Sequence, residues 1–395
     1  MMIPTGMSRP LRILLASPAY WPAHAFGGPV VVLRELVSRL ATRGHTVDVL
    51  TTTLRDVAGR PSARTASAVV DGARVTYLAT PLRYRWMGLT PTLPLALGQL
   101  ERPDVAHVVG FRDPVTTAVA AWCRARRVPY VFEPVGMFRP RLRKVLLKRA
   151  FDATLTRGVA RGARLVLVSS PGERDDVIAC GVDPERVRLR GNGFPEPPPA
   201  GSGDPLAGIV PPGAPVVLYV GRLAAEKGVE FLLETARRLP EVHVVLVGPD
   251  DRHGTLRAVQ AARADPATRD RVHRLPPSDG PPFDLYRRAD VFVLASGGEN
   301  FGLVAAEAAA VGTPVVVSDR SGVAASFAHG EALVVPYEQE ATIEAIRRIL
   351  DDDELRARLA RGALAAAGRS SWDDVVDAQV GLYDEALVLK QHKRC

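Results

Sequence analysis

The sequence lacks long apolar runs and is poor in cysteine. No stretch of 18 apolar residues occurs in its 395 residues, so we expect no transmembrane helix. The apolar run 13–16 is too short for the core of a signal peptide, and Met7 is an alternative start. The three cysteines, Cys123, Cys180 and Cys395, show no Cys-x-x-Cys spacing. Their odd number argues against a disulfide framework or a structural zinc site and favours the reducing cytosol.

The common signatures of nucleotide and hydrolase sites are also missing. No Gly-x-Gly-x-x-Gly follows the first expected strand, and no Gly-x4-Gly-Lys-Ser/Thr loop occurs. Neither a His-x-x-x-His pair nor a nucleophile-elbow serine is present. These absences argue against dehydrogenases, P-loop enzymes, zinc hydrolases with that His pair and serine hydrolases of the elbow type.

What the sequence does contain is a regular alternation of short β-branched runs with helical stretches. Uniformly apolar strands that alternate with helices predict parallel sheets covered on both faces. The expected strands are 12–17, 47–52, 75–79, 105–109, 130–133, 165–169 and 187–190, followed by 216–220, 242–247, 272–275, 291–294, 315–318 and 333–335. Expected helices in the first half include 30–43, 115–127 and 142–160.

A break in composition divides this alternation in two. Residues 194–215 hold eight prolines and four glycines, which neither a helix nor a central strand accommodates. We predict an α/β chain with two doubly wound, Rossmann-like domains, 1–195 and 216–370, and a linker over 196–215. Such domains bind ligands outside the carboxyl ends of their strands, so we expect the ligands in an interdomain cleft. We expect the helical tail 371–395 to pack back on the first domain.

Positive charge is concentrated in the first half of the chain. Residues 1–200 carry 29 Lys and Arg against 15 Asp and Glu, whereas residues 201–395 carry 22 against 28. The segment 139–164 has nine basic residues and one acid. This asymmetry favours an anionic partner, and with the arginines and aromatics that begin the segment 83–100 it fits contact with an anionic membrane. A solvated basic face and a core-facing 87–100 are the alternative, while nucleic acid is not expected because no binding motif occurs.

Three loops, each at the carboxyl end of an expected strand, carry the candidate chemistry. Gly27 and Gly28 precede a helix whose first N–H groups can bind phosphate, although a plain tight turn explains them equally well. Arg222 and Lys227 follow the first strand of the second domain and direct two cations at one spot, as a diphosphate requires. A solvated loop is the alternative there.

The third loop, 296–307, leads into an alanine-rich helix. Glu299 lies in the loop, and we expect Glu307 about two turns into a helix that begins near Gly302. The N–H groups of 302–304 would then face the same phosphate as the two cations. A carboxylate is a usual acceptor for the vicinal hydroxyls of a ribose or hexose. The alternative for Glu307 is a buried ion pair.

Together these segments resemble a known family. The stretches 221–228, 289–296, 299–307 and 312–319, with Gly44-His45-Thr-Val, Asp104-Val-Ala-His107 and Gly191-Asn192-Gly193, are similar to the retaining glycosyltransferases of family 4. The resemblance covers nearly the whole chain and implies the two-domain GT-B fold. It also implies transfer of a sugar from a UDP- or GDP-sugar to a hydroxyl of a polysaccharide, glycolipid or natural product, with no cofactor and no metal.

The resemblance assigns roles to individual residues. Arg222 and Lys227 would bind the donor diphosphate and stabilise the leaving group, while Glu299 would hold a hydroxyl of the donor sugar. Glu307 would bind the ribose, and Gly27 and Gly28 would close over the reaction centre. The remaining donor-binding residues implied are Asn300, Phe301, Gly302 and Leu303, with Gly302 and Leu303 offering backbone N–H groups.

One position departs from the family pattern. Many members have His-Gly where this chain has Val135-Gly136, and that histidine meets the donor sugar. Either the histidine is dispensable, its role has moved to Glu133, or the chain is catalytically weak. Glu133 is equally well explained by an ion pair with an arginine such as Arg139. His107 and Asn192 are further candidates for donor or acceptor contact.

Two other functions fit parts of the pattern. A nucleotide-sugar epimerase of the GT-B type would need acid and base residues around the sugar ring, for which the Glu299 and Glu307 arrangement is unsuited. A degenerate sugar-nucleotide-binding subunit would explain Val135 but not the presence of Arg222, Lys227 and Glu299. For a transferase we expect a cytoplasmic location, with contact to the inner face of the membrane through 83–100 and 139–164.

Overall fold

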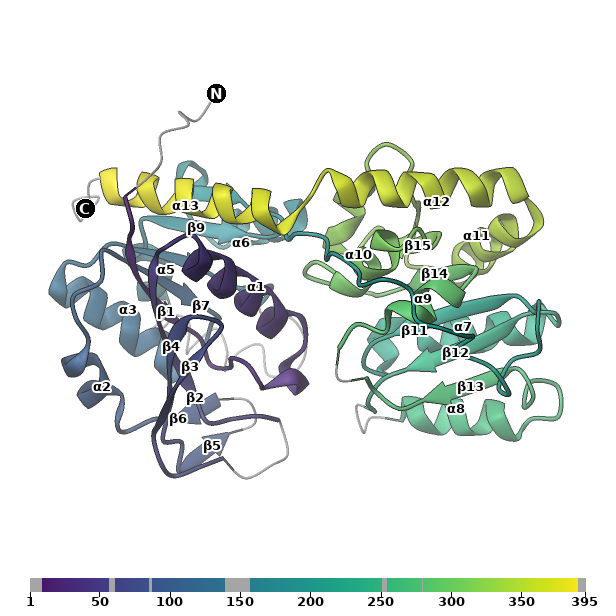
Figure 1. Cartoon of the computed structure of the whole chain (residues 1–395), viewed down its shortest axis with the longest axis horizontal. Helices are drawn as coiled ribbons and strands as arrows, with labels where there is room; N and C mark the ends of the chain where they lie inside the picture. The colour runs from purple at the N-terminus through teal and green to yellow at the C-terminus, as the bar shows by residue number, and fades with distance from the viewer. Residues whose placement is uncertain are drawn as a thin grey trace. The chain divides into compact units, whose positions relative to one another are not determined.

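The computed structural model describes residues 9–56, 61–84, 87–138, 157–250, 254–278 and 280–389. Contacts between residues divide the chain into two compact units. The first consists of Met1–Gly191 and Trp372–Cys395, and the second of Asn192–Ser371. The chain therefore enters the second unit just before the expected boundary at 195, and its last helix belongs to the first unit (Figure 1).

The first unit is built on an eight-stranded sheet in the order β10-β9-β8-β7-β1-β2-β4-β3. Its strands are β1 Arg12–Ala16, β2 Thr46–Thr52, β3 Ala66–Val70, β4 Ala73–Leu78, β7 Val105–Val109, β8 Tyr130–Glu133, β9 Leu165–Val168 and β10 Val187–Leu189. All neighbours are parallel except β3, which runs antiparallel to β4. The predicted parallel sheet is confirmed over its other strands, and the antiparallel edge strand β3, which the sequence did not predict, is exposed and made largely of small residues.

Helices cover this sheet on both faces because its strands are apolar on both sides. On β7, Val108 packs in a core with Val115 and Val119, whereas the adjacent His107 faces Tyr383 of the last helix. The helices of the unit are α1 Gly28–Thr42, α2 Leu93–Gln99, α3 Pro114–Arg126, α5 Arg157–Gly162, α6 Pro171–Ala179 and α13 Trp372–Val388, with short 3-10 turns at His24–Phe26 and Pro184–Arg186. Asp113 and Ser170 cap α3 and α6 by accepting N–H groups of their first turns.

The segment 83–100 is divided between surface and core. It contains most of a two-stranded hairpin, β5 Leu82–Tyr84 and β6 Met87–Leu89, followed by α2. Leu93 and Leu97 of α2 are buried, whereas Leu82, Tyr84 and Leu89 of the hairpin are exposed. Most of the other basic segment, residues 139–156, lies outside the described residues.

The second unit contains a fully parallel sheet in the order β13-β12-β11-β14-β15-β16. Its strands are β11 Val216–Val220, β12 His243–Val247, β13 Val272–Leu275, β14 Val291–Leu294, β15 Val315–Ser318 and β16 Leu333–Val335. Its helices are α7 Val229–Arg238, α8 Thr255–Ala264, α9 Phe283–Arg288, α10 Leu303–Ala310, α11 Gln339–Asp351 and α12 Asp353–Gly368, with 3-10 turns at Ala225–Lys227 and Gly322–Phe327. After β13 the chain returns to pair β14 with β11, so the strand order reverses there.

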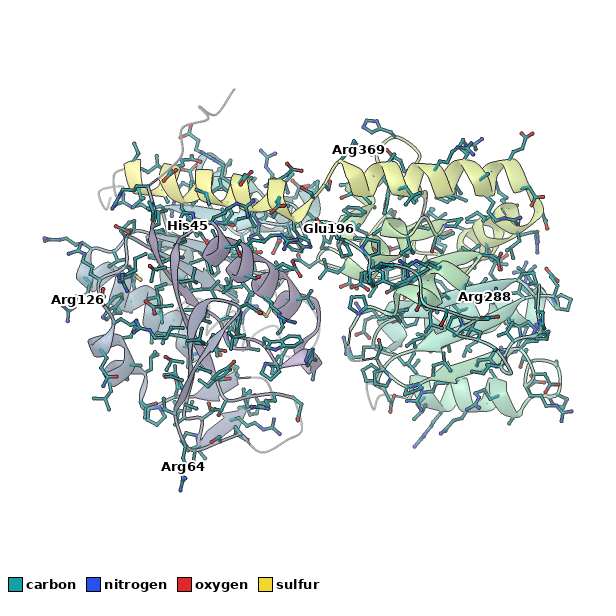
Figure 2. The ribbon with its side chains drawn as sticks, viewed as in Figure 1. His45, Arg64, Arg126, Glu196, Arg288 and Arg369 are labelled. Carbon is teal, nitrogen blue, oxygen red and sulfur yellow. The ribbon has the colours of Figure 1, made fainter. Side chains whose placement is uncertain are left out.

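The proline-rich segment 196–215, expected as a linker, is part of the second unit. Leu206 and Val210 are buried in one of its cores. Asp204 pairs with Arg288, which Figure 2 labels, at 3.3 Å. The burial of Leu206 and Val210 and the ion pair of Asp204 therefore hold this segment on the second unit.

Candidate active site

The reversal of strand order in the second unit brings the predicted loops together. β11 lies between β12 and β14, and β15 is the next strand along. Because parallel strands end at the same edge, the loops after β11 and β14 flank the reversal point. Ligands of doubly wound sheets bind at such a point.

The absence of a side chain at Gly228 allows the loop after β11 to touch the loop after β14. Gly228 has φ +68°, and a Cβ placed on it would lie 2.0 Å from the carbonyl oxygen of Ala295. The N–H of Gly297 donates to the carbonyl of Glu226 at 2.7 Å, which joins the loops a second time. The backbone around Lys227 is therefore fixed against the loop that carries Glu299.

The two loops present an ion pair. The Lys227 ammonium donates to Oε2 of Glu299, and their side chains are 14 % and 26 % exposed. The Arg222 guanidinium lies further out, half exposed, 3.2 Å from the Glu226 carboxylate. Lys227 is the only lysine between positions 149 and 389 of an arginine-rich chain. A compact ammonium rather than a planar guanidinium thus occupies the inner position.

The loop after β15 holds Glu299 by its backbone. The N–H of Glu299 donates to the carbonyl of Arg320 at 3.1 Å, and the carbonyl of Glu299 accepts from the N–H of Gly322 at 3.1 Å. The Arg320 guanidinium lies 5.2 Å from the ring centroid of Tyr337. A Cβ on Gly297 would come within 3.1 Å of that ring. The carboxylate of Glu299 is therefore presented by a backbone fixed on both sides.

The helix α10 begins directly after this loop. Gly302 precedes it with φ +106°, a conformation that favours glycine. The N–H of Ala305 donates back to the Gly302 carbonyl at 3.0 Å, and the N–H groups of Leu303 and Val304 come before that bond. Groups in this position have no partner within the helix and favour an anion. The neighbouring Phe301 is buried, and Asn300 is half-buried.

Glu307 is the fifth residue of α10, about one turn in rather than two as predicted. It is buried, and the Tyr286 hydroxyl donates to its Oε2 at 2.7 Å. Burial raises the pKa of Glu307 to about 7, although the hydrogen bond from Tyr286 lowers it. Among the described residues the partner of Glu307 is a neutral hydroxyl rather than the cation that a buried ion pair would require.

His107 and Glu133 lie in a buried network of the first unit. His107 contacts Glu133 at 3.1 Å and the Tyr383 hydroxyl at 2.9 Å. Arg190 donates to Glu133 at 2.9 Å and to Gln379 at 2.8 Å. Burial alone would raise the pKa of Glu133, but Arg190 and His107 lower it. These contacts connect the sheet to α13 and give both residues structural partners.

Glu133 pairs with an arginine, Arg190, as the alternative interpretation expected, and Arg139 lies outside the described residues. Val135 has φ +53°, an uncommon conformation for a β-branched residue, and lies in the turn after β8.

Gly27 has φ +71° and caps α1, whose first residue is Gly28. Asn192 is buried at the start of the second unit.

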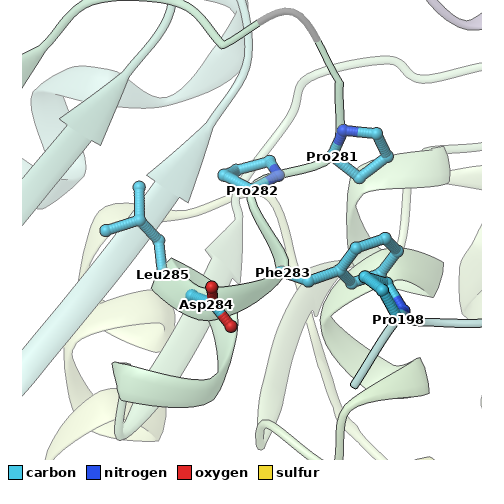
Figure 3. Close-up of a pocket in the computed structure, with 6 residues that line it drawn as sticks. All are labelled: Pro198, Pro281, Pro282, Phe283, Asp284 and Leu285. Atoms are coloured by element: carbon cyan, nitrogen blue, oxygen red, sulfur yellow. The ribbon is translucent and has the colours of Figure 1, made fainter. Parts of the chain in front are cut away.

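One pocket of about 240 Å³ lies elsewhere on the second unit, lined by Pro198, Pro281, Pro282, Phe283, Asp284 and Leu285 (Figure 3). Its one carboxylate, Asp284, accepts from the N–H of Gly201 at 3.1 Å and from Arg287 at 2.9 Å. The pocket thus lies where the proline-rich segment meets α9, and it contains none of the predicted site residues. Among the described residues, no three His, Cys, Asp or Glu side chains are grouped to hold a metal ion.

Two family models match the chain. The model described as "Glycosyl transferases group 1" matches residues 208–365, and "Glycosyl transferase 4-like domain" matches residues 27–193. The first therefore falls within the second unit, and the other covers most of the first. The chain belongs to the GT-B glycosyltransferases of the family 4 type.

Relatives and solved structures agree with this glycosyltransferase assignment. The D-inositol 3-phosphate glycosyltransferase of Xylanimonas cellulosilytica is 38% identical over 183 residues, 45% of this chain and 44% of that protein. The protein of the same description from Stackebrandtia nassauensis is 28% identical over 395 residues, 91% of this chain and 87% of that protein. The chain thus spans less than half of the first relative and most of the second.

The fold is shared with sucrose-phosphate synthase from Thermosynechococcus elongatus, with a TM-score of 0.74, 24% identity and coverage of 95% of this chain and 98% of that chain. Anabaena HepE, solved in complex with UDP-glucose, has a TM-score of 0.73 at 19% identity and covers 95% of this chain and 99% of its own.

Three residues of this candidate site were missed from the sequence. Tyr286 bonds Glu307, the carbonyl of Arg320 holds Glu299, and Tyr337 packs beside Gly297. Tyr286 and Glu307 are 21 positions apart and on different helices, so no helical spacing relates them. Of the three, only Arg320 could have been found from the sequence. It lies two residues after the end of β15, and the loops at this edge of the sheet converge.

The close approach at Gly228 is testable by Gly228→Ala. The added methyl would meet the Ala295 carbonyl, so we expect a larger loss of stability than left-handed strain alone causes. Gly213→Ala is the matched control, since Gly213 has φ +77° and open space around its Cβ position. We expect Gly228→Ala to lower the unfolding temperature by at least about 2 °C more than the control. Equal shifts would show that the two loops do not touch there.

The raised pKa of Glu307 predicts a pH-dependent stability. The folded pKa of about 7 exceeds the ordinary value of 4.5, so the folded state holds the proton more tightly. The stabilisation that comes from this tighter proton binding is complete below about pH 4.5. As the pH rises to 7 it is lost, which lowers the free energy of unfolding by roughly 3 kcal/mol. Glu307→Gln removes this dependence. Between pH 5 and 8 the unfolding temperature of the wild type should fall relative to the variant, and a constant difference would contradict the assignment.

Proposed function

We propose that the protein is a retaining, metal-independent glycosyltransferase that takes its sugar from a UDP-sugar, with GDP-sugars as the second donor class. The observation that carries the proposal is the convergence of Lys227, Glu299 and the start of α10 at the reversal point of the second sheet. We choose uridine as the donor base because the solved complexes of Anabaena HepE contain UDP and UDP-glucose.

Lys227 and Arg222 would bind the diphosphate, together with the N–H groups of Leu303 and Val304. Two cations and a helix N-terminus neutralise the charge that develops on the leaving group. Glu299 would leave its pairing with Lys227 and accept a hydroxyl of the donor sugar. The ion pair seen here thus holds both groups ready while the charge of each is compensated.

Retention follows if the acceptor hydroxyl attacks from the side of the leaving diphosphate. The bond from the anomeric carbon to the phosphate oxygen breaks, the bond to the acceptor oxygen forms, and a diphosphate oxygen takes the hydroxyl proton. This scheme assigns no general base to the Val135 position or to Glu133. The engagement of Glu133 with Arg190 and His107 supports leaving it out.

Glu307 would accept hydrogen bonds from the ribose hydroxyls of the donor. Its Oε2 is occupied by Tyr286, which leaves Oε1 for the ligand. Hydroxyl donors stabilise the charged form of a carboxylate, so donor binding would lower the pKa of Glu307.

For the acceptor we propose a polyol or sugar that carries a phosphate, either free or as a lipid headgroup. The support is the description of the relatives as D-inositol 3-phosphate glycosyltransferases. The excess of basic residues in 1–200 suits an anionic acceptor. We place the enzyme in the cytosol, where nucleotide-sugars are available to it.

The replacement Lys227→Ala tests the diphosphate assignment. Removing one cation from the developing charge should lower kcat/KM for transfer at least tenfold, whereas Lys227→Arg should retain part of the rate. Release of nucleoside diphosphate from UDP- and GDP-sugars, with inositol 3-phosphate as acceptor and with EDTA present, provides the assay. Arg237→Ala is the control, because Arg237 is half exposed on α7 and pairs with Glu234.

Four outcomes would contradict the proposal. Near-wild-type kinetics of Lys227→Ala would show that Lys227 does not stabilise the leaving diphosphate. Conversion of the donor sugar to an isomer without acceptor would indicate an epimerase, and donor binding without hydrolysis or transfer would indicate a binding subunit. Loss of wild-type activity in EDTA, restored by a divalent cation, would contradict metal independence.

A further inference from the structure

The β5–β6 hairpin of the first unit presents an apolar face to solvent. Its antiparallel register pairs Leu82 with Leu89, Arg83 with Gly88, and Tyr84 with Met87. Directly opposed residues share a face, and faces alternate along each strand. Leu82, Tyr84, Met87 and Leu89 therefore form one face, which we call the hairpin surface.

The opposite face fixes the orientation of the hairpin. Gly88 is buried, and a Cβ on it would lie 2.6 Å from Thr80 and 3.3 Å from Leu54. Arg83 donates to the carbonyl of Asp56 at 3.1 Å. This inner face packs on the unit, whereas Leu82, Tyr84 and Leu89 of the hairpin surface are 65 %, 57 % and 50 % exposed.

Two exposed arginines, Arg55 and Arg64, lie on loops next to the hairpin. Residues 53–100 contain six arginines and two acids, Asp56 and Asp71, and Asp71 pairs with Arg34 at 2.8 Å. Exposed Arg55 and Arg64 lie on loops that are bonded to the base of the hairpin: Ser62 accepts from Thr80 at 2.8 Å and from Thr53 at 2.9 Å. Figure 2 shows Arg64 projecting from the end of the unit that carries the hairpin in Figure 1.

We propose that the hairpin surface docks the protein on an anionic lipid bilayer. Leucine and tyrosine side chains on an exposed ribbon suit the boundary between headgroups and acyl chains, and the adjacent arginines suit anionic headgroups. Among the described residues no helix is both long and apolar enough to cross a bilayer. This inference goes beyond the proposed function, because it holds whether the acceptor is free or lipid-linked.

Cosedimentation of the full chain with vesicles tests the proposal. Vesicles of phosphatidylglycerol and phosphatidylcholine should bind the wild type, and vesicles of phosphatidylcholine alone should bind it at least tenfold more weakly. The double replacement Leu82→Ser with Leu89→Ser should lower affinity for the anionic vesicles at least tenfold. Arg55→Ser and Arg64→Ser should each lower it about fivefold and weaken its salt dependence.

Leu189→Ser is the matched control, since Leu189 is an exposed leucine on β10 of the same unit, and it should bind like the wild type. Unchanged unfolding temperatures and unchanged release of UDP from a soluble donor separate this test from the proposed function. Absence of wild-type binding, or equal binding by the double variant, overturns the proposal. Concentration-dependent dimerisation that the double variant loses, without vesicle binding, would overturn it in favour of a contact between copies.

Discussion

The reversal of strand order between β11 and β14 is the constraint on which the site depends. It brings the ends of two strands that are 74 residues apart in sequence, Val220 and Leu294, to neighbouring places on one edge. The glycine at 228 then lets the two loops touch, and the ion pair of Lys227 with Glu299 spans them. A diphosphate site requires this kind of fixed backbone, because preorganised donors need no rearrangement when charge develops.

Two buried carboxylates show how the surroundings decide the state of an acid. In the first unit, Arg190 and His107 compensate Glu133 and lower its pKa despite burial. In the second, the partner of Glu307 among the described residues is the neutral Tyr286 hydroxyl, and burial raises the pKa of Glu307 to about 7. The first arrangement fixes α13 to the sheet of its unit. The second leaves an acceptor atom whose charge a ligand's hydroxyl groups would stabilise.

The sequence predicted the elements whose signal is local. The two strands that precede the site loops, Val216–Val220 and Val291–Leu294, are continuous runs of apolar and aromatic residues, and the loops follow them directly. The hairpin strands are three residues each, too short for an alternation to stand out, and β3 is made largely of small residues. Glu133 and Arg190 are 57 positions apart, and His107 and Tyr383 are 276 apart, so only the folded chain relates them.

The central claim is that the loops of the second unit bind a nucleoside diphosphate. The most direct measurement is thermal unfolding of the wild type with UDP, GDP, dTDP and ADP, each without metal. A ligand at about 100 times its Kd stabilises by about 2.7 kcal/mol, which raises the unfolding temperature by several degrees. We expect that one nucleotide, UDP first, stands out from the others. The absence of a shift with all four would contradict it.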